Sequence, residues 1–251
     1  MKKKLFVVIP VLVVFLCAFA QKKTYKRYYS YNIRLSFTNL VGSEPLQIDS
    51  VYQNPFGEPF TVSQLKYYIS NVSFSNSDGK EVKVPNTYFL VNEQDSASKN
   101  FMVNSLLGTI TAVNFYLGVD SLKNVSGVQT NALDPLNGMF WTWSTGYIMA
   151  KMEAVSPLSK APQQRVTYHI GGFKGENNVV KKISLPLSAA LKLKPGDTAT
   201  ININADINKW FAGANDIKIA DINFCMNPGP LANKIAANYA AMFSVTSSFS
   251  Q

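Results

Sequence analysis

The sequence has few of the residue types that most often carry out chemistry. It contains 1 histidine and 2 cysteines among 251 residues. The single histidine, His169, restricts acid–base catalysis, and the chain has neither a Gly-x-Ser-x-Gly elbow nor a phosphate-binding glycine loop. No spacing of its glutamates identifies a carboxylate pair of the glycosidase kind. We therefore expect a protein that is not an enzyme.

Long apolar runs are also missing, except at the N-terminus. Lys2 to Lys4 form a basic region, Leu5 to Leu16 form an apolar region, and Ala18-Phe19-Ala20 has the pattern of a cleavage site. This run is shorter than the about 20 residues that span a bilayer. Residues 1–20 are thus predicted to be a signal peptide. The chain is expected to be exported, periplasmic or extracellular, with no later transmembrane segment.

Lipoprotein anchoring through Cys17 is the competing interpretation of this segment. Val14-Phe15-Leu16 lacks the small residues expected just before a lipidated cysteine, so cleavage after Ala20 is favoured. Cleavage removes Cys17 and leaves Cys225 as the only thiol. An intramolecular disulfide is then excluded, and the fold is expected to depend on its hydrophobic core or on bound metal.

Acidic residues are outnumbered by basic ones, 15 to 24, for a formal net charge of +9. Three of these positive charges belong to the signal peptide, so the mature chain carries +6. Lys22, Lys23, Lys26 and Arg27 concentrate much of this excess in a basic N-terminal arm, residues 21–30. An arm without a nucleic-acid-binding motif, on an exported chain, does not indicate nucleic-acid binding.

The dominant pattern in the mature chain is alternation of apolar and polar residues. Ile33, Leu35 and Phe37 alternate with polar neighbours, as a half-buried strand requires. Asp78-Gly79 is a hairpin-turn signal. Many short strands separated by Gly, Pro and Asn are typical of a sandwich or barrel. Strands are expected at residues 31–38, 65–74, 82–84, 87–91, 110–117, 147–152, 165–170, 179–187, 198–205 and 217–224.

Helix signals are few. The clearest runs from Pro230 to Phe243, with Pro230 suited to a first helical turn and apolar residues on one face. Asn100 to Leu107 and Asp206 to Phe211 are expected to be short helices. The sequence therefore predicts an all-β chain, a single-domain antiparallel β-sandwich with one C-terminal helix. The sandwich is expected to span residues 31–245, followed by a C-terminal tail at 246–251.

An aromatic motif stands out at Met139 to Tyr147, where Trp141 and Trp143 lie two residues apart. In an extended segment both indoles would point to one face. Aromatic pairs of this kind are mainly core residues. A contact platform for a peptide, glycan or surface partner is the functional alternative, and it requires at least one exposed tryptophan.

The wider pattern around this motif resembles the MbnP-like family of exported, copper-associated β proteins, in the form found in Bacteroidetes-type members. The resemblance covers nearly all of the mature chain. It is carried, in order, by Leu65-Lys66-Tyr67-Tyr68-Ile69-Ser70-Asn71-Val72, Phe115-Tyr116-Leu117-Gly118-Val119, Ala132-Leu133-Asp134-Pro135, Met139-Phe140-Trp141-Thr142-Trp143, Tyr168-His169-Ile170-Gly171-Gly172 and Ala232-Asn233-Lys234-Ile235-Ala236-Ala237-Asn238-Tyr239.

The resemblance implies copper as the cofactor, held by histidines, with an oxidised tryptophan (kynurenine) at the site. In some systems a di-haem peroxidase-type partner performs that oxidation. Trp141 or Trp143 would be the modified residue, and His169 a metal ligand. One histidine excludes a two-histidine site within this chain, but copper(I) accepts soft ligands. Met226 and Cys225 are therefore candidate metal ligands, and Met139 is a candidate site-lining residue.

Three alternatives stay open. Met226 could pack in the core and His169 could satisfy hydrogen bonds near Gly171-Gly172, in a non-catalytic binding module or in a structural module that has lost metal binding. Calcium is a further alternative, less favoured than copper, because loop oxygens suit this ion. Its candidate ligands are Asp120, Asp134 and Asn137, whose spacing matches no EF-hand loop and which occur commonly in turns.

Overall fold

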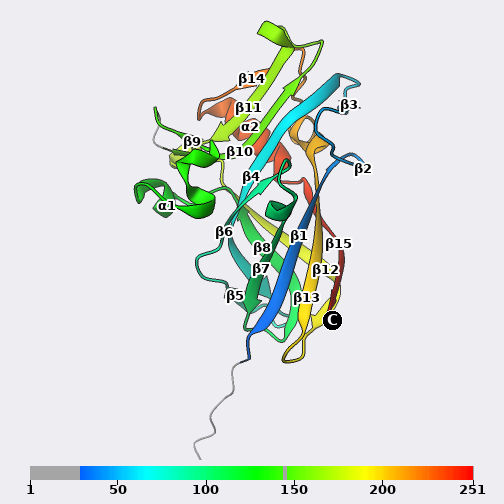
Figure 1. Cartoon of the computed structure of the whole chain (residues 1–251), viewed down its shortest axis with the longest axis vertical. Helices are drawn as coiled ribbons and strands as arrows, with labels where there is room; N and C mark the ends of the chain where they lie inside the picture. Colours follow the sequence, from blue (N-terminus) through cyan, green and yellow to red (C-terminus); the bar gives the residue numbers. More distant parts are fainter. Residues whose placement is uncertain (1–28, 144–145, 251) are drawn as a thin grey trace, which may run out of the picture.

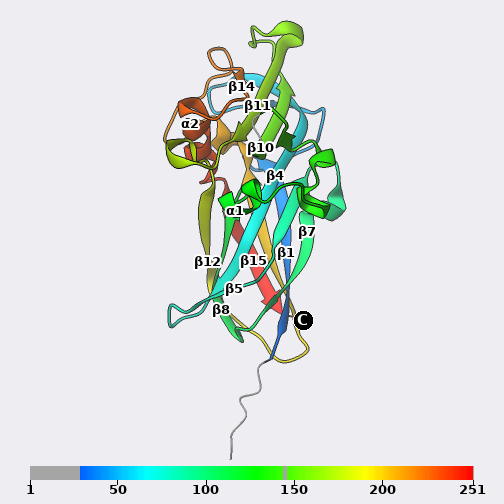
Figure 2. The ribbon, with the colours of Figure 1, turned by 90° about the vertical axis from the view of Figure 1, so that its left-hand side faces the viewer.

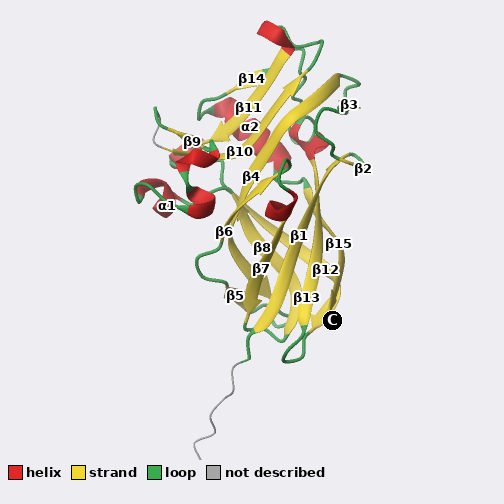
Figure 3. Ribbon diagram, viewed as in Figure 1, coloured by secondary structure: helices red, strands yellow, loops and turns green. Residues whose placement is uncertain are grey.

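The computed structural model describes residues 29–143 and 146–250 of the chain. The predicted signal peptide and most of the basic arm lie outside the described residues, as does part of the aromatic motif, residues 144–145. The molecule is elongated, with strands running along its length and the helices gathered in one half (Figures 1 and 3). None of the helices within the described ranges is long and apolar enough to cross a membrane.

The strands of the described chain form two sheets, which confirms the predicted β-sandwich. The smaller sheet has the order β15-β13-β1-β2, with β7 also paired to β1. Its strands are β1 (Tyr31–Val41), β2 (Glu44–Pro45), β7 (Asn100–Ser105), β13 (Thr198–Asp206) and β15 (Phe243–Ser250). Pairing is not antiparallel throughout, because β1 runs parallel to β13.

The larger sheet has the order β12-β8-β4-β10-β11-β14, and its last pair, β11 with β14, is also parallel. Strands β3, β5 and β6 pair with β4, and β9 pairs with β10. The bounds are β3 (Val51–Gln53), β4 (Pro59–Ser75), β5 (Glu81–Lys83), β6 (Tyr88–Asn92), β8 (Thr109–Leu117), β9 (Phe140–Trp141), β10 (Gly146–Val155), β11 (Arg165–Gly171), β12 (Lys181–Lys192) and β14 (Phe224–Cys225).

Helical segments are short. The α-helices are α1 (Ser121–Val125) and α2 (Pro230–Tyr239), and α1 stands out from the side of the molecule that faces the viewer in Figure 2. The 3-10 turns are η1 (Ser96–Lys99), η2 (Asn131–Leu133), η3 (Pro135–Asn137), η4 (Pro162–Gln164), η5 (Gly175–Asn177) and η6 (Ile207–Trp210). The helix predicted from Pro230 is confirmed as α2, and the short helix expected at Asp206 to Phe211 is the 3-10 segment η6.

The core lies between the two sheets and is rich in aromatic rings. Phe37 of β1 packs against Tyr67 of β4, Phe115 of β8 and Phe243 of β15, with ring centroids 5.9–6.5 Å apart. Its neighbours on β1, Ile33 and Leu35, are fully buried. The alternation seen in the sequence thus places one face of β1 in the core, as a two-residue side-chain period requires.

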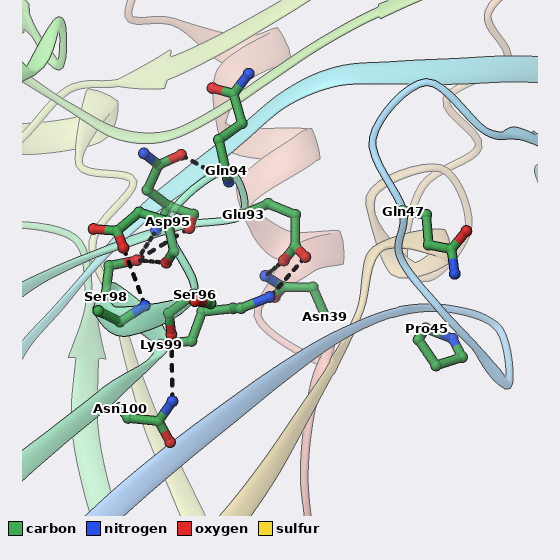
Figure 4. Close-up of polar contacts among 12 residues, drawn as sticks. Asn39, Pro45, Gln47, Glu93, Gln94, Asp95, Ser96, Ser98, Lys99 and Asn100 are labelled. Carbon is green, nitrogen blue, oxygen red and sulfur yellow. Dashed lines mark hydrogen bonds and ion pairs between the residues drawn. The ribbon is translucent and has the colours of Figure 1, made fainter.

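A buried carboxylate, Glu93, ties the smaller sheet to the loop after β6 (Figure 4). Its Oε2 accepts from Asn39 Nδ2 at 2.7 Å, and its Oε1 lies 2.7 Å from Lys99 Nζ. The Oδ1 atom of Asn39 in turn accepts a hydrogen bond from the hydroxyl of Tyr67 at 2.8 Å. Burial, and then the charge of Glu93, raise the pKa of Tyr67, so this hydroxyl stays a donor that links β4 to β1.

Three segments differ from the sequence prediction. Residues 243–250 form β15 and pair with β13, instead of ending a helix and leading into a free tail; Phe243 anchors them in the core. Asn100 to Leu107, expected to be helical, is largely strand β7, because Phe101 and Val103 alternate into the core. Residues 217–223 form a loop where a strand was expected, with β14 only at its end.

Candidate functional site

The candidate site lies on the outer face of the larger sheet, where β4, β10 and β11 run side by side. The strand register places Lys66 opposite Lys151, and Lys151 opposite His169. Paired residues of neighbouring strands point to the same face, so these three side chains form a row. Glu153, two residues after Lys151, shares that face. Lys151 and His169 are each only 8% exposed.

The imidazole of His169 is paired with Glu153. Its Nε2 lies 2.8 Å from Glu153 Oε1, and Lys151 Nζ lies 3.9 Å from the same oxygen. Burial lowers the pKa of His169 and the Lys151 charge lowers it further, whereas the hydrogen bond that His169 donates to Glu153 and the charge of Glu153 raise it. The neutral ring is favoured. An ionised carboxylate only accepts, so Nε2 carries the proton and Nδ1 keeps its lone pair.

The lysines of this row hold the chain segment that precedes the tryptophans. Lys151 Nζ donates to Gly138 O at 2.7 Å, and Lys66 Nζ donates to Asn137 O at 3.1 Å. Gly138 has φ of +70°, which a glycine adopts without strain. Burial, followed by repulsion from Lys66, lowers the pKa of Lys151, while Glu153 raises it. Both ammonium groups therefore fix the start of the aromatic motif.

Trp141 lies on the same face as His169. Its ring covers Gly171, where an added Cβ would lie 2.4 Å from Cζ3. Because side chains two residues apart on a strand share a face, His169 and Gly171 point the same way. Trp141 is buried, and its Nε1 has no hydrogen-bond partner among the described residues. Trp141 is thus in contact with the strand that carries His169.

Trp143 is the outer member of the pair. It is 60% exposed, and its ring centroid lies 5.1 Å from that of Trp141. This contact agrees with the expectation that both indoles lie on one side. The requirement of an exposed tryptophan for a contact platform is also met. Met139, by contrast, is fully buried, and its carbonyl accepts from Ile148 N at 2.9 Å, so it serves the core.

The two sulfur candidates lie on opposite faces of the sheet. The parallel register pairs Tyr168 with Cys225 and Thr167 with Phe224. Cys225 therefore points into the core with Tyr168, and burial raises the pKa of its thiol to about 11. Met226, one residue later, lines an outer-face cavity together with Glu153 and Thr167. The structure brings Met226 and His169 to one face and separates Cys225 from them.

Two residues of the site, Lys151 and Glu153, were missed in the sequence. The feature that could have revealed them is that they are two charged residues within an otherwise apolar strand, Gly146–Val155, most of which is buried. Sequence spacing alone could not pair them with His169, because their contact depends on the register of β10 against β11.

The oxygen atoms proposed for calcium are used in local hydrogen bonds. Asp120 caps α1 and accepts from Asn71 and Tyr88. Asp134 caps η3, and the Asn137 amide donates to the carbonyls of Asn131 and Ala132. These contacts explain the residues as turn formers and give calcium no support.

The candidate ligands on this face are one imidazole and one thioether. A neutral imidazole and a thioether are both accepted by copper(I), which tolerates few and soft ligands. Across the described ranges, no group of three or more His, Cys, Asp and Glu residues could hold a metal ion. Lys151 adds a positive charge beside His169. His169 and Met226 supply donor types that copper(I) accepts, and the described residues offer no group of three His, Cys, Asp or Glu side chains for a closed copper(II) site.

Comparison with known proteins gave two matches. The family model described as MbnP matches residues 30–227. A solved structure, MbnP from Methylosinus trichosporium, aligns over 80% of this chain and 83% of that chain, with 12% identity and a TM-score of 0.50. At this identity the likeness concerns the fold alone. No curated protein sequence matches the chain.

Proposed function

Because the chain belongs to the MbnP family, we propose that it is an exported copper-binding protein whose ligands are His169 and Met226. Copper bound in this way would supply a one-electron redox centre or a transferable copper(I) ion. The protein's own part is to present a neutral nitrogen and a thioether on one rigid sheet face. Export rests on the predicted signal peptide, residues 1–20.

The observation that carries this proposal is the hydrogen bond between His169 and Glu153. Histidines that bind metal commonly donate their other ring N–H to a carboxylate, which fixes the tautomer and orients the ring. Here Nε2 has that partner at 2.8 Å, and Nδ1 is left as the ligand atom. Met226 belongs to the same face because it lines a cavity with Glu153.

Trp141 is the candidate for oxidation to kynurenine, since it shares the face of His169. Conversion requires an oxidant that delivers two oxygen atoms to the indole ring. Water then releases one carbon as formate, so the side chain gains one oxygen and loses one carbon. A partner of the di-haem peroxidase type is the proposed source of oxidising equivalents. Trp143, exposed and 5.1 Å away, would be the first indole that such a partner meets.

A second candidate function is a non-catalytic binding or structural module that has lost metal binding. The ammonium group of Lys151 favours it, since that cation lies 3.9 Å from the carboxylate partnered by His169 and repels a metal ion. On this account the exposed Trp143 is a contact residue, and His169 is satisfied by Glu153 alone.

The protein purified from its native host tests these proposals together. Intact mass should correspond to a chain beginning at Gln21, with about 4 Da added if Trp141 is kynurenine. Peptide mapping would then find the change at Trp141 and not at Trp143. Metal analysis should find copper in cells grown with copper. An unmodified, copper-free protein from such cells would favour the second candidate.

A further inference from the structure

A cavity of about 540 Å³ opens on the outer face of β10, β11 and β14, beyond His169 along the sheet. The residues that line it belong to the β10–β11 hairpin and to the segment around β14, and these elements lie at one end of the molecule (Figure 1). Its walls include Glu153, Arg165, Phe224 and Met226. The volume falls within the range of about 300–1,000 Å³ that small-molecule sites occupy.

Opposite charges stand at two places in this cavity. The register pairs Val155 with Arg165 and Glu153 with Thr167, so Arg165 and Glu153 are diagonal neighbours on one face. They form no ion pair with each other, although such diagonal positions are only about 7–8 Å apart. Both groups are therefore available to a bound molecule.

Each of the two charged groups keeps free hydrogen-bonding capacity. Glu153 uses Oε1 for His169 and Lys151, and its Oε2 has no partner among residues 29–143 and 146–250. The guanidinium group of Arg165 makes one hydrogen bond among the described residues, from Nε to Pro162 O at 3.3 Å. Its two terminal amino groups, which can bind a carboxylate in bidentate fashion, have no partner within the same ranges.

Apolar side chains form the wall between the two charges. Phe224 is 54% exposed although it belongs to a β-strand, and the half-buried Met226 lies two residues further on. Strand alternation turns both away from the core, where Cys225 points. An aromatic ring and a thioether exposed beside a charged pair suit a ligand that has an apolar body and charged ends.

The loop that forms the rim of the cavity has an unusual backbone. Gln163 and Gln164 are consecutive non-glycine residues with φ of +59° and +56°. Left-handed conformations are unfavourable for such residues and tend to cluster at ligand sites. Backbone bonds hold them here, with Ser156 N donating to Gln164 O at 2.9 Å and Gln164 N donating to Ala161 O at 3.0 Å. This loop positions Arg165 at the cavity.

We propose that this cavity binds a zwitterionic molecule of the amino-acid type, either a free amino acid with a large apolar side chain or a short apolar peptide. The carboxylate pairs with the terminal amino groups of Arg165, and the ammonium group binds Glu153 Oε2. The apolar side chain lies against Phe224 and Met226. This site shares Glu153 and Met226 with the proposed copper site, but it does not require the metal.

Calorimetric titration of the mature, metal-free chain tests the proposal. The probes are L-phenylalanine, the dipeptide Phe-Phe, N-acetyl-L-phenylalanine and L-phenylalaninamide. The first two should bind saturably, and preference between them identifies a free amino acid or a peptide. Loss of the ammonium charge in the acetylated probe, or of the carboxylate in the amide, should each weaken binding about tenfold or more, as for a charge-assisted hydrogen bond.

Variants make the test specific to the cavity. Arg165→Gln should weaken L-phenylalanine or Phe-Phe binding about tenfold or more, and Arg165→Lys should restore part of it. Arg34→Gln, which removes an exposed arginine of β1, should leave binding unchanged. Saturable binding of no probe would overturn the proposal, as would equal affinities for the wild type and Arg165→Gln. Copper binding is measured separately, so failure here leaves the metal proposal intact.

Discussion

The indole of Trp141 lies directly on Gly171, so close that a single added carbon at Gly171 would overlap Cζ3 at 2.4 Å and Cη2 at 2.7 Å. This contact places the buried tryptophan of the aromatic motif on the strand that carries His169. It also explains why the chain has a glycine at this point of β11, where a side chain would otherwise stand. The position of Trp141 thus depends on the absence of one methyl group.

Gly171→Ala should therefore destabilise the protein by about 1–3 kcal/mol, the usual cost of overpacking a core. Trp141→Phe removes the two overlapping atoms. The double variant should then be destabilised by less than the sum of the single changes, since residues in contact do not behave additively. Urea unfolding of the four proteins measures this coupling. Simple additivity would show that the ring does not rest on Gly171.

A pH dependence follows from the lowered pKa of His169. Between this folded value and the unfolded value of about 6.5, the unfolded chain binds more protons than the native chain. The free energy of unfolding therefore rises with pH across that window. Stability should be lost as the pH falls through about 6.5 and should level off below the folded pKa.

His169→Gln removes this proton linkage and serves as its control. Other groups titrate equally in both proteins, so the difference between the two curves isolates the histidine. Chemical unfolding should show a smaller loss of stability on acidification for the variant than for the wild type. Parallel curves from neutral pH to pH about 5 would contradict a buried, neutral His169.

Much of the fold could be predicted because alternation reports burial directly. Strand β1 was predicted from the alternation of Ile33, Leu35 and Phe37 with polar residues. The turn between β4 and β5 was predicted from Asp78-Gly79. The last strand, β15, was missed because Ser and Thr fill its outward positions and Phe243 could equally end a helix. The parallel partners of β1 and β11 lie far away in sequence, and no local pattern specifies them.

The site was predictable only in part. The sequence proposed His169, Met226, Cys225 and the two tryptophans as candidates, but it could not rank Trp141 against Trp143, or Met226 against Cys225. Side-chain alternation separates Met226 from Cys225, because a shift of one residue reverses the face, whereas only burial separates Trp141 from Trp143, which lie on one side and differ in exposure. Glu153 and Lys151 meet His169 only through the β10–β11 register, which no spacing along the chain encodes.

Glu58 holds the loop that leads to Met226. Its buried carboxylate accepts from Ile219 N at 2.7 Å, Ala220 N at 3.0 Å and Asn54 Nδ2 at 2.6 Å. Glu58→Ala leaves these donors buried without partners and should cost about 3 kcal/mol in the free energy of unfolding. Glu44→Ala, at an exposed position, should cost little. A similar small loss in both variants, measured by urea unfolding, would contradict this role.

Cys225 should be unreactive in the folded protein. Burial raises the pKa of its thiol to about 11, and the thiolate is the reactive form. Iodoacetamide at mildly alkaline pH should label the mature chain slowly when native and rapidly in urea, as followed by mass spectrometry. Equal rates in the two states would mean that the thiol reaches solvent and that Cys225 does not face the core.

Copper(I) affinity, measured by competition with a coloured chelator, is the most direct test of the central claim. The mature wild-type chain should bind one equivalent under reducing conditions. His169→Ala should abolish this binding and Met226→Leu should weaken it, because each removes a ligand from the same face. Cys225→Ala should bind as the wild type does, since its side chain lies on the other face. Undiminished binding by His169→Ala, or failure of the wild type to bind, would contradict the account.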